Sequence, residues 1–266
     1  MTDVTTPATE LLRLHQAPEL LTVVNVWDVA SAKVVAGTPG TKALATASHS
    51  IAATFGFEDG EQIPAGLMLE MVGRIVAATD LPVTADLEDG YGEQPRDVAE
   101  TIARAIAAGA VGANLEDGTG DPARPLAATA THARRVEVAR GRAEAEGVAL
   151  VINARTDVFI RGAGGVDEAL ERGRAYAEAG ADCFFAIGLR DPEAIAALVE
   201  GLPIGVSVLA TPAGPSIPEL AALGVARISL GPGPMGIALA ALQRAAEGIL
   251  AGGDLPADLA FRPPAN

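Results

Sequence analysis

Short apolar, β-branched runs recur eight times along the 266 residues, and Ala-rich amphipathic segments separate them. Most of the helical segments end at or near a glycine, the residue preferred just beyond a helix C-terminus. Repeated strand–helix units require a parallel sheet, and eight units within about 250 residues favour a closed (β/α)8 TIM barrel. The expected strands are residues 22–28, 43–48, 82–88, 112–117, 150–156, 182–188, 203–209 and 226–231.

A doubly wound open sheet is the alternative fold. A nucleotide-binding version of it has no support, because neither a GxGxxG nor a GxxxxGK[ST] motif follows the first strand. No domain boundary is visible, so residues 1–266 are expected to form one domain, with a core at about 20–250 and a tail at 251–266. Two irregular segments, 49–66 and 118–127, interrupt the rhythm, and long loops of this kind usually carry function in a barrel.

The charge balance excludes several partners. The formal net charge is −15, which argues against nucleic acid and against an anionic membrane surface, because both require a Lys/Arg-rich face. No uncharged apolar stretch is long enough to span a bilayer, and the N-terminus lacks the pattern of a signal peptide. The single cysteine, Cys183, lies in an apolar run, so we expect a buried, unreactive thiol in a cytoplasmic protein.

Carboxylates follow two neighbouring strands of the expected barrel. Asp86 and Glu88 are two residues apart and share one face of a strand, and Asn114 and Glu116 repeat the arrangement on the next strand. Catalytic groups in a barrel collect at these carboxyl ends. Several carboxylates facing one small space repel each other unless a cation or protons intervene, and an all-oxygen ligand set favours Mg2+ first and Mn2+ second.

Other polar residues at strand ends have competing interpretations. Arg155 closes an apolar run and suits a substrate carboxylate or phosphonate, or else forms a salt bridge with Asp157 or another acid. Ser48 and His49 end the second strand, where a hydroxyl and backbone N–H groups can hold a second carboxylate. His49 is also a candidate general acid or base.

Four further polar residues are given ordinary structural roles. Asp89 and Asp117 are interpreted as turn residues or helix caps. His15 and His132 lie in polar helical segments and are expected at the surface.

Taken in order, five motifs resemble the isocitrate lyase/phosphoenolpyruvate mutase superfamily over nearly the whole chain. Each motif alone is weak, whereas their combination in this order is specific. The motifs are NVWDVASA (25–32), TASHSIAATFGFEDG (46–60), ADLEDGYG (85–92), NLEDG (114–118) and NARTDVF (153–159).

The resemblance implies a Mg2+-dependent (β/α)8 barrel that acts on a small anionic 2-oxo acid or enolate-type substrate. It also implies a homo-oligomer, typically a tetramer or dimer of dimers, whose last helix swaps between subunits. Asp86 matches the principal metal carboxylate. Three more acids match positions that reach the metal, partly through water: Asp59, Glu88 and Glu116.

The resemblance assigns the substrate-binding residues as well. Arg155 matches the substrate-binding arginine, and Trp27 matches a region that lines the pocket. The turn whose backbone amides and hydroxyl hold the substrate carboxylate corresponds to Ala47, Ser48 and His49.

The chain departs from the family pattern in two places. The second acid of the metal motif is often Asp and is Glu88 here. The Lys-x-Cys-Gly-His loop of the lyases is replaced by EDGTGDPARPLA, which argues against a cysteine-dependent isocitrate or methylisocitrate lyase. The mutase loop's asparagine is also absent. Asp121 and Arg124 are the reactive residues in this loop and join Arg155 and His49 as candidate catalytic residues.

Three functions remain open from the sequence. The first is a Mg2+-dependent lyase of small 2-oxo or 2-hydroxy di- or tricarboxylic acids, which works through an enolate by C–C cleavage or decarboxylation. The second is a phosphonopyruvate- or phosphoenolpyruvate-type mutase or hydrolase, which breaks a P–C bond. The third is a barrel that binds a metabolite without turnover.

Overall fold

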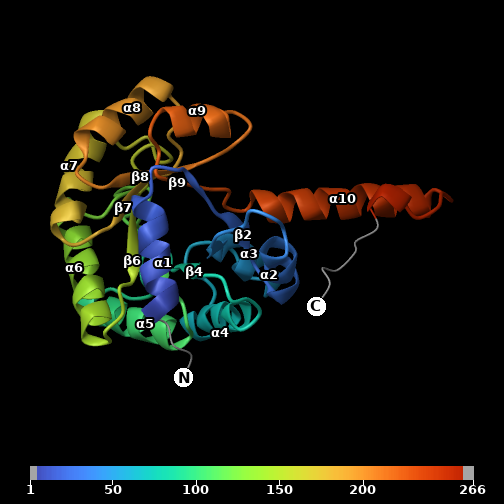
Figure 1. Cartoon of the computed structure of the whole chain (residues 1–266), viewed down its shortest axis with the longest axis horizontal. Coiled ribbons are helices and arrows are strands. Elements are labelled where there is room, and N and C mark those ends of the chain that lie inside the picture. Colours follow the sequence, from blue (N-terminus) through green and yellow to red (C-terminus); the bar gives the residue numbers. More distant parts are fainter. Residues whose placement is uncertain (1–4, 260–266) are drawn as a thin grey trace.

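The computed structural model describes residues 5–259, and within them a single parallel sheet closes into a barrel. Leu21–Thr22 (β1) and Val24–Val26 (β2) form one extended segment that changes partner at Val23. β1 pairs with Arg227–Ser229 (β9), while β2 pairs with Leu44–Thr46 (β3). The sheet is therefore continuous around the barrel, which confirms the predicted (β/α)8 fold (Figure 1).

Every predicted strand is present, and helices on the outside follow the strands. The apolar residues that alternate outward pack against the buried faces of these helices to form the core. The remaining strands are β4 Val83–Asp86, β5 Gly112–Glu116, β6 Val151–Thr156, β7 Cys183–Ala186 and β8 Gly205–Leu209. The helices are α1 Thr5–Gln16, α2 Val29–Ala36, α3 Ser48–Thr54, α4 Ala65–Val76, α5 Pro95–Ala107, α6 Thr129–Ala145, α7 Val166–Glu178, α8 Pro192–Gly201, α9 Ile217–Ala222 and α10 Gly233–Leu250, with a 3-10 turn at Ala257–Leu259.

Helix α1 covers one end of the barrel instead of joining the outer ring. Leu11 is fully buried, and a Cβ on Gly112 of β5 would lie 2.8 Å from its Cδ2 atom, so Leu11 packs directly against that strand. His15 is 6% exposed, and its Nδ1 atom lies 2.8 Å from the Leu11 carbonyl oxygen. The expectation that His15 lies at the surface is wrong, because its helix is the floor of the barrel.

Asp117 is a buried junction between strands and helices. Its Oδ2 atom accepts hydrogen bonds from Thr156 (2.8 Å), Arg172 (3.1 Å) and Tyr176 (2.8 Å). His132 of α6 is fully buried and stacks edge-on against the Tyr176 ring. The predictions of an ordinary turn acid and a surface histidine are therefore wrong, because residues of α7 pack against both Asp117 and His132.

Of two other predictions about single residues, the one for the burial of Cys183 is confirmed and the one for Asp89 is incomplete. Cys183 is buried, as expected, and burial raises the pKa of its thiol to about 12. Asp89 is more than a turn residue, because its carboxylate lies 3.4 Å from Arg135 of α6.

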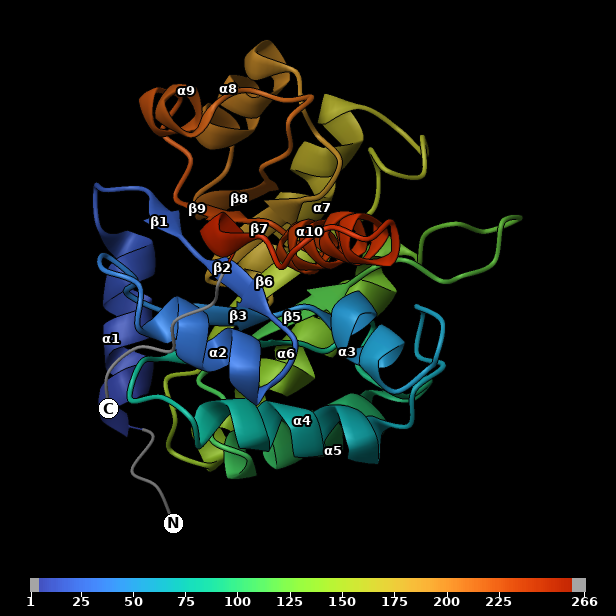
Figure 2. The ribbon, with the colours of Figure 1, turned by 90° about the vertical axis from the view of Figure 1, so that its right-hand side faces the viewer.

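Helix α10 extends away from the barrel (Figures 1 and 2). None of its residues is buried in the single chain, although apolar side chains recur along it; Ile237 is 73% and Leu242 66% exposed. A helix that leaves this much apolar surface in water is unusual unless a partner covers it. No helix among residues 5–259 combines the length and apolarity needed to cross a bilayer. Of the predicted tail, residues 260–266 lie outside the described part of the chain.

We expect Asp117→Ala to lower the free energy of unfolding by about 3 kcal/mol, since it leaves the Arg172 guanidinium and the Tyr176 hydroxyl buried without their acceptor. Urea unfolding followed by circular dichroism measures the change. Glu144→Ala, at an exposed position of α6, is the control and should change stability by less than about 0.5 kcal/mol. A loss below about 1 kcal/mol for Asp117→Ala would contradict a central role for this junction.

Candidate active site

The predicted acids gather where β4 and β5 end. Asp86 is the last residue of β4 and pairs in register with Asn114 of β5, and Glu116 is the last residue of β5. The ladder continues past the end of β4, because the Glu116 N–H donates to the Glu88 carbonyl oxygen at 2.8 Å. In the same register Glu116 lies beside Arg155 of β6. The closed sheet thus brings Asp86, Glu88, Glu116 and Arg155 to one mouth.

Asp86 is held by the first residue of α3. Its Oδ2 atom accepts hydrogen bonds from the Ser48 backbone N–H (3.1 Å) and the Ser48 hydroxyl (2.7 Å). Its Oδ1 atom is buried and has no hydrogen-bond partner in the described residues. One oxygen of this carboxylate is therefore fixed, while the other is available to a ligand. The two Ser48 donors predicted to hold a substrate carboxylate bind Asp86 in this structure.

Glu88 adopts a strained backbone conformation. Its φ is +53°, a left-handed value that is uncommon outside glycine, and Glu61 (+58°) and Tyr91 (+58°) share it. The three residues contact each other: the Glu61 N–H and the Tyr91 hydroxyl donate to the Glu88 carboxylate, and the Tyr91 N–H donates to Glu61 Oε1 at 2.6 Å. The 49–66 segment is thereby attached to the end of β4 through the acid that the sequence singled out.

Arg155 is paired with two acids at the mouth. Its Nη1 atom lies 2.5 Å from Glu116 Oε2, and its Nε atom lies 2.8 Å from Asp157 Oδ1. Arg155 thus forms the salt bridge to Asp157 that the sequence left open as an alternative, and a second one to Glu116. The Arg155 side chain is still 15% exposed, so these two acids do not enclose it completely. Asp157 is completely buried and also contacts Arg161 at 3.2 Å.

The carboxylates shift each other's acidity. Burial and the charge of Asp86 raise the pKa of Glu88 to about 7, and Asp59 contributes in the same direction. Burial raises the pKa of Glu116 well above its ordinary value, although the Arg155 cation opposes this shift. For Arg155 itself, burial lowers the pKa, but Glu116 and Asp157 outweigh burial and hold the pKa above its usual value. Like charges in a partly dry mouth favour a bound cation or a retained proton.

A metal could bind here only with the help of water or of a substrate. In residues 5–259 no group of three His, Cys, Asp or Glu side chains is arranged to hold a metal ion directly. Mg2+ nevertheless suits the site, because it usually binds one or two carboxylates and keeps several waters. The buried, partnerless Asp86 Oδ1 is the donor that fits a direct bond, and Glu88 and Glu116 fit contacts through water.

Glu61 is a functional-site residue that the sequence analysis missed. Burial and a hydrogen bond shared with Asp89 raise its pKa to about 8. A carboxyl group with a pKa near 8 keeps its proton at neutral pH. Nothing in the sequence marks Glu61, since the contact depends on how the long loop folds back over the barrel mouth.

The remaining predicted residues lie in different settings around the mouth. Trp27 is partly buried, and its backbone N–H donates to the Ser31 hydroxyl. Ala47 is buried at the start of α3. His49 is the second residue of α3, and Asp59 lies in the 49–66 segment. Both are exposed. Asp59 is close enough to Glu88 to raise its pKa.

Asp121 and Arg124 belong to a self-contained loop. Arg124 Nε lies 3.3 Å from Asp121 Oδ2, and the Asp121 Oδ1 atom accepts a hydrogen bond from the Ala123 N–H. That hydrogen bond lowers the pKa of Asp121, and Arg124 is exposed. A backbone bridge between Gly118 and Leu126 closes the loop. The structure brings these two residues together, but with each other instead of with Arg155.

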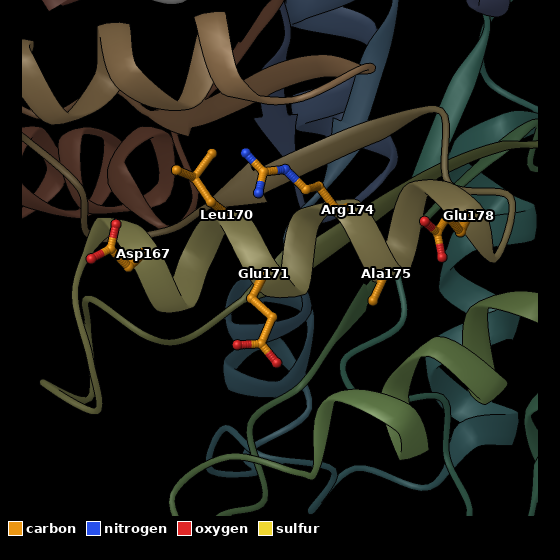
Figure 3. A pocket seen from close by; sticks show the side chains of 6 residues that line it. All are labelled: Asp167, Leu170, Glu171, Arg174, Ala175 and Glu178. Atoms are coloured by element: carbon orange, nitrogen blue, oxygen red, sulfur yellow. The ribbon is translucent and has the colours of Figure 1, made fainter.

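A surface depression elsewhere does not belong to this site. It has a volume of about 590 Å³ and lies along the surface of α7. Asp167, Glu171 and Glu178 are among the residues that line it (Figure 3). All of its lining residues come from α7, and none comes from a strand end.

Comparisons with known proteins agree with this geometry. Residues 11–250 match the family model described as phosphoenolpyruvate phosphomutase. A Burkholderia cenocepacia J2315 structure, provisionally described as a phosphonomutase, is 47% identical with a TM-score of 0.86, covering 94% of this chain and 100% of that chain. A 2,3-dimethylmalate lyase of the PEP mutase/isocitrate lyase superfamily is 28% identical (TM-score 0.85, 97% and 92% covered). A phosphonopyruvate hydrolase solved with oxalate and Mg2+ is 25% identical (TM-score 0.83, 96% and 91% covered).

The fold and the mouth define a (β/α)8-barrel protein of the enzyme class that comprises lyases and phosphomutases. The chain belongs to the phosphoenolpyruvate phosphomutase family, within the isocitrate lyase/PEP mutase superfamily, as its motifs indicated.

The raised pKa of Glu61 predicts an unusual pH dependence of stability. A carboxyl group whose pKa is raised by folding stabilises the protein while it is protonated and loses that contribution as pH rises. Above about pH 7.5 the buried histidines no longer add an opposite trend, because an unfolded histidine is then mostly neutral. Stability of the wild type in EDTA should therefore fall from about pH 7.5 to pH 8.5, through the pKa of Glu61.

Glu61→Gln should reduce this fall and leave the variant about 1 kcal/mol more stable than the wild type at pH 8.5, after allowance for solvent screening of a partly exposed group. Thermal unfolding at each pH measures the difference. Glu58→Gln, at an exposed position of the same loop, should follow the wild-type profile. Parallel pH profiles for wild type and Glu61→Gln would show that Glu61 does not hold the extra proton.

Proposed function

We propose that this protein is a Mg2+-dependent lyase that acts on a small 2-oxo or 2-hydroxy di- or tricarboxylic acid through an enolate. The observation that carries the proposal is the pairing of an available carboxylate oxygen, Asp86 Oδ1, with a partly exposed arginine side chain, Arg155, at one barrel mouth. An anion with two oxygen groups would be held between a cation bound at Asp86 and Arg155.

Different residues of the chain would have different roles in such a reaction. When bound, Mg2+ would supply a Lewis acid that stabilises negative charge developing on a substrate oxygen. Arg155 would orient the remaining anionic group, and its ion pairs with Glu116 and Asp157 fix the guanidinium in place. Ser48 would keep Asp86 in its orientation through two hydrogen bonds. Glu88, with a pKa of about 7, would be able to hold or release a proton near neutral pH.

The loop after β5 limits which bond can break. It contains neither the cysteine of the lyase loop nor another residue placed to deliver a proton, because Asp121 and Arg124 are bonded to each other. Decarboxylation, as with oxaloacetate, needs no loop acid to begin. The proposal therefore favours a reaction in which carbon dioxide or another stable fragment leaves first and the enolate is protonated afterwards.

A phosphonopyruvate-type hydrolase or mutase is the second candidate. The family model and the 47% identical structure described as a phosphonomutase favour it. The same carboxylates and Arg155 would bind phosphonopyruvate, so the two candidates differ in the bond that breaks and not in the binding site.

Substrate assays separate the candidates. Purified protein with Mg2+ is offered oxaloacetate, 2-methylisocitrate and phosphonopyruvate, and release of pyruvate and of phosphate is followed. Turnover of a carboxylic acid without phosphate release supports the lyase. Phosphate release alone would reject the lyase in favour of the second candidate, and no turnover at all would favour a metabolite-binding barrel.

Asp86→Ala should weaken Mn2+ binding at least about tenfold, because it removes the carboxylate oxygen proposed as the direct ligand. Electron paramagnetic resonance of free Mn2+ measures the affinity without needing the substrate. Glu93→Ala, an exposed acid just after the ADLEDGYG motif, removes the same charge and should bind Mn2+ like the wild type. Unchanged affinity in Asp86→Ala would reject the metal site.

We also propose that α10 is covered by another copy of this chain in a tetramer or dimer of dimers. The support is the exposed apolar surface of a helix that makes few contacts with its own barrel. If α10 were exchanged between subunits, a second copy of the same chain would cover this apolar surface, and no different protein would be needed.

Leu242→Glu should lower the molar mass in solution, because it places a charge on the apolar face that the second copy would cover. Size-exclusion chromatography with light scattering measures the mass. Gln243→Glu adds the same charge at the adjacent polar position and should leave the mass unchanged. A wild-type protein that runs as a monomer would contradict the proposed assembly.

A further inference from the structure

Arg227 is a charged residue inside the barrel that forms no salt bridge with any residue from 5 to 259. It is fully buried at the start of β9, and the following residue, Ile228, faces the outer core, so Arg227 points into the barrel. Unlike Arg155 and Arg172, it forms no salt bridge in the described part of the chain. A buried cation is costly unless hydrogen bonds or nearby charges compensate it, so the contacts that Arg227 does make are informative.

One contact joins Arg227 to the barrel floor. Its Nη1 atom lies 3.4 Å from His15 Nε2. The other ring nitrogen, Nδ1, lies 2.8 Å from the Leu11 carbonyl oxygen, which can only accept, so Nδ1 carries the proton. Nε2 is therefore the acceptor for Arg227. Burial and the Arg227 charge lower the pKa of His15 to about 3, which keeps the ring neutral.

The second contact fixes an amide below the metal site. Arg227 Nη2 lies 3.4 Å from Asn114 Oδ1, and Asn153 Nδ2 donates to the same oxygen at 2.8 Å. A guanidinium only donates, so the Asn114 atom that faces it must be the oxygen and not the nitrogen. With its oxygen held by Arg227 and by Asn153 of the neighbouring strand, the Asn114 amide directs its N–H groups away from these two donors.

The position of Asn114 makes this orientation relevant to the site. Asn114 is the register partner of Asp86 and lies two residues before Glu116, on the same face of β5. It is 5% exposed, and both of its side-chain hydrogen bonds described above use the oxygen and leave the amide nitrogen for another acceptor. A donor beside the carboxylates would meet an oxygen of an anion bound at the mouth.

We propose that Arg227 is a positioning residue that locks the Asn114 amide with its N–H groups toward the mouth, where Asn114 donates to an oxygen of the bound anionic substrate. This inference rests on the proposed function, because it assumes an anion bound near Asp86. The guanidinium itself does not touch the substrate. If it were lost, only Asn153 would hold the Asn114 oxygen. Because Asn153 Oδ1 has no partner in the described residues, both amides could then turn together and place the Asn114 oxygen toward the mouth, where it would repel the anion.

Oxalate binding in the presence of Mg2+ tests the proposal. Titration calorimetry is performed on the wild type, Arg227→Met, Asn114→Ala and the double variant. Methionine has a similar length and removes the buried charge, a change that folded proteins often tolerate. Each single variant should bind oxalate about tenfold more weakly, the usual effect of losing one hydrogen bond to a charged group. The double variant should bind no more weakly than the worse single variant, because both remove the same donor.

Two further measurements separate positioning from general damage. Mn2+ affinity without oxalate should stay within about twofold of the wild type in all three variants, because none of them removes a proposed ligand. Ser207→Ala is the matched control: Ser207 is the register partner of Arg227 on β8, and its hydroxyl has no partner in the described residues, so oxalate binding should not change.

The outcomes distinguish this inference from the proposed function. Wild-type oxalate affinity in Arg227→Met, or losses that multiply in the double variant, would reject the role of Arg227 while leaving the metal site intact. Weaker Mn2+ binding in Arg227→Met would also reject it, since the residue would then support the metal carboxylates. Failure of the wild type to bind oxalate with Mg2+ would reject the proposed function and this inference together.

Discussion

Charge placed inside a barrel must be balanced locally, and this constraint organises the whole site. The closed parallel sheet brings the acidic strand ends to one mouth, where water cannot screen them fully. Ser48 balances Asp86 with two hydrogen bonds, and Arg155 balances Glu116 and Asp157. Burial and the nearby Asp89 raise the pKa of Glu61 to about 8. Burial, together with the repulsion that remains between the acids, raises the pKa values of Glu88 and Glu116, which is the condition under which a cation binds favourably.

The periodic pattern of apolar residues in the sequence was enough to predict most of the fold. All eight strands were predictable because each is a short apolar run between amphipathic helices, and parallel strands place their carboxyl ends together. The candidate acids followed from that geometry. For Glu88, however, alternation was an incomplete argument: β4 ends at Asp86, and Glu88 has a left-handed backbone. It joins the site because the ladder to Glu116 continues beyond the strand.

The residues that the sequence analysis misjudged are those whose environment comes from distant segments. Asp117 resembles a turn acid until α7 supplies Arg172 and Tyr176. His15 lies in a polar-looking helix that closes the floor of the barrel. Arg227 follows a short apolar run and has no local feature of a site residue, since its partners are 113 and 212 positions away. Local patterns specify elements, whereas these contacts depend on how the elements are arranged.

The loop after β5 has a consequence for how this family diversifies. Its backbone bridge and its Asp121–Arg124 pair keep it folded without help from the barrel. Its start, Gly118, is constrained, because a Cβ there would lie 2.8 Å from the Asp157 carboxylate. Beyond that hinge the residues are mostly exposed. A loop of different sequence can therefore replace this one while the strand ends that carry the acids and Arg155 stay unchanged.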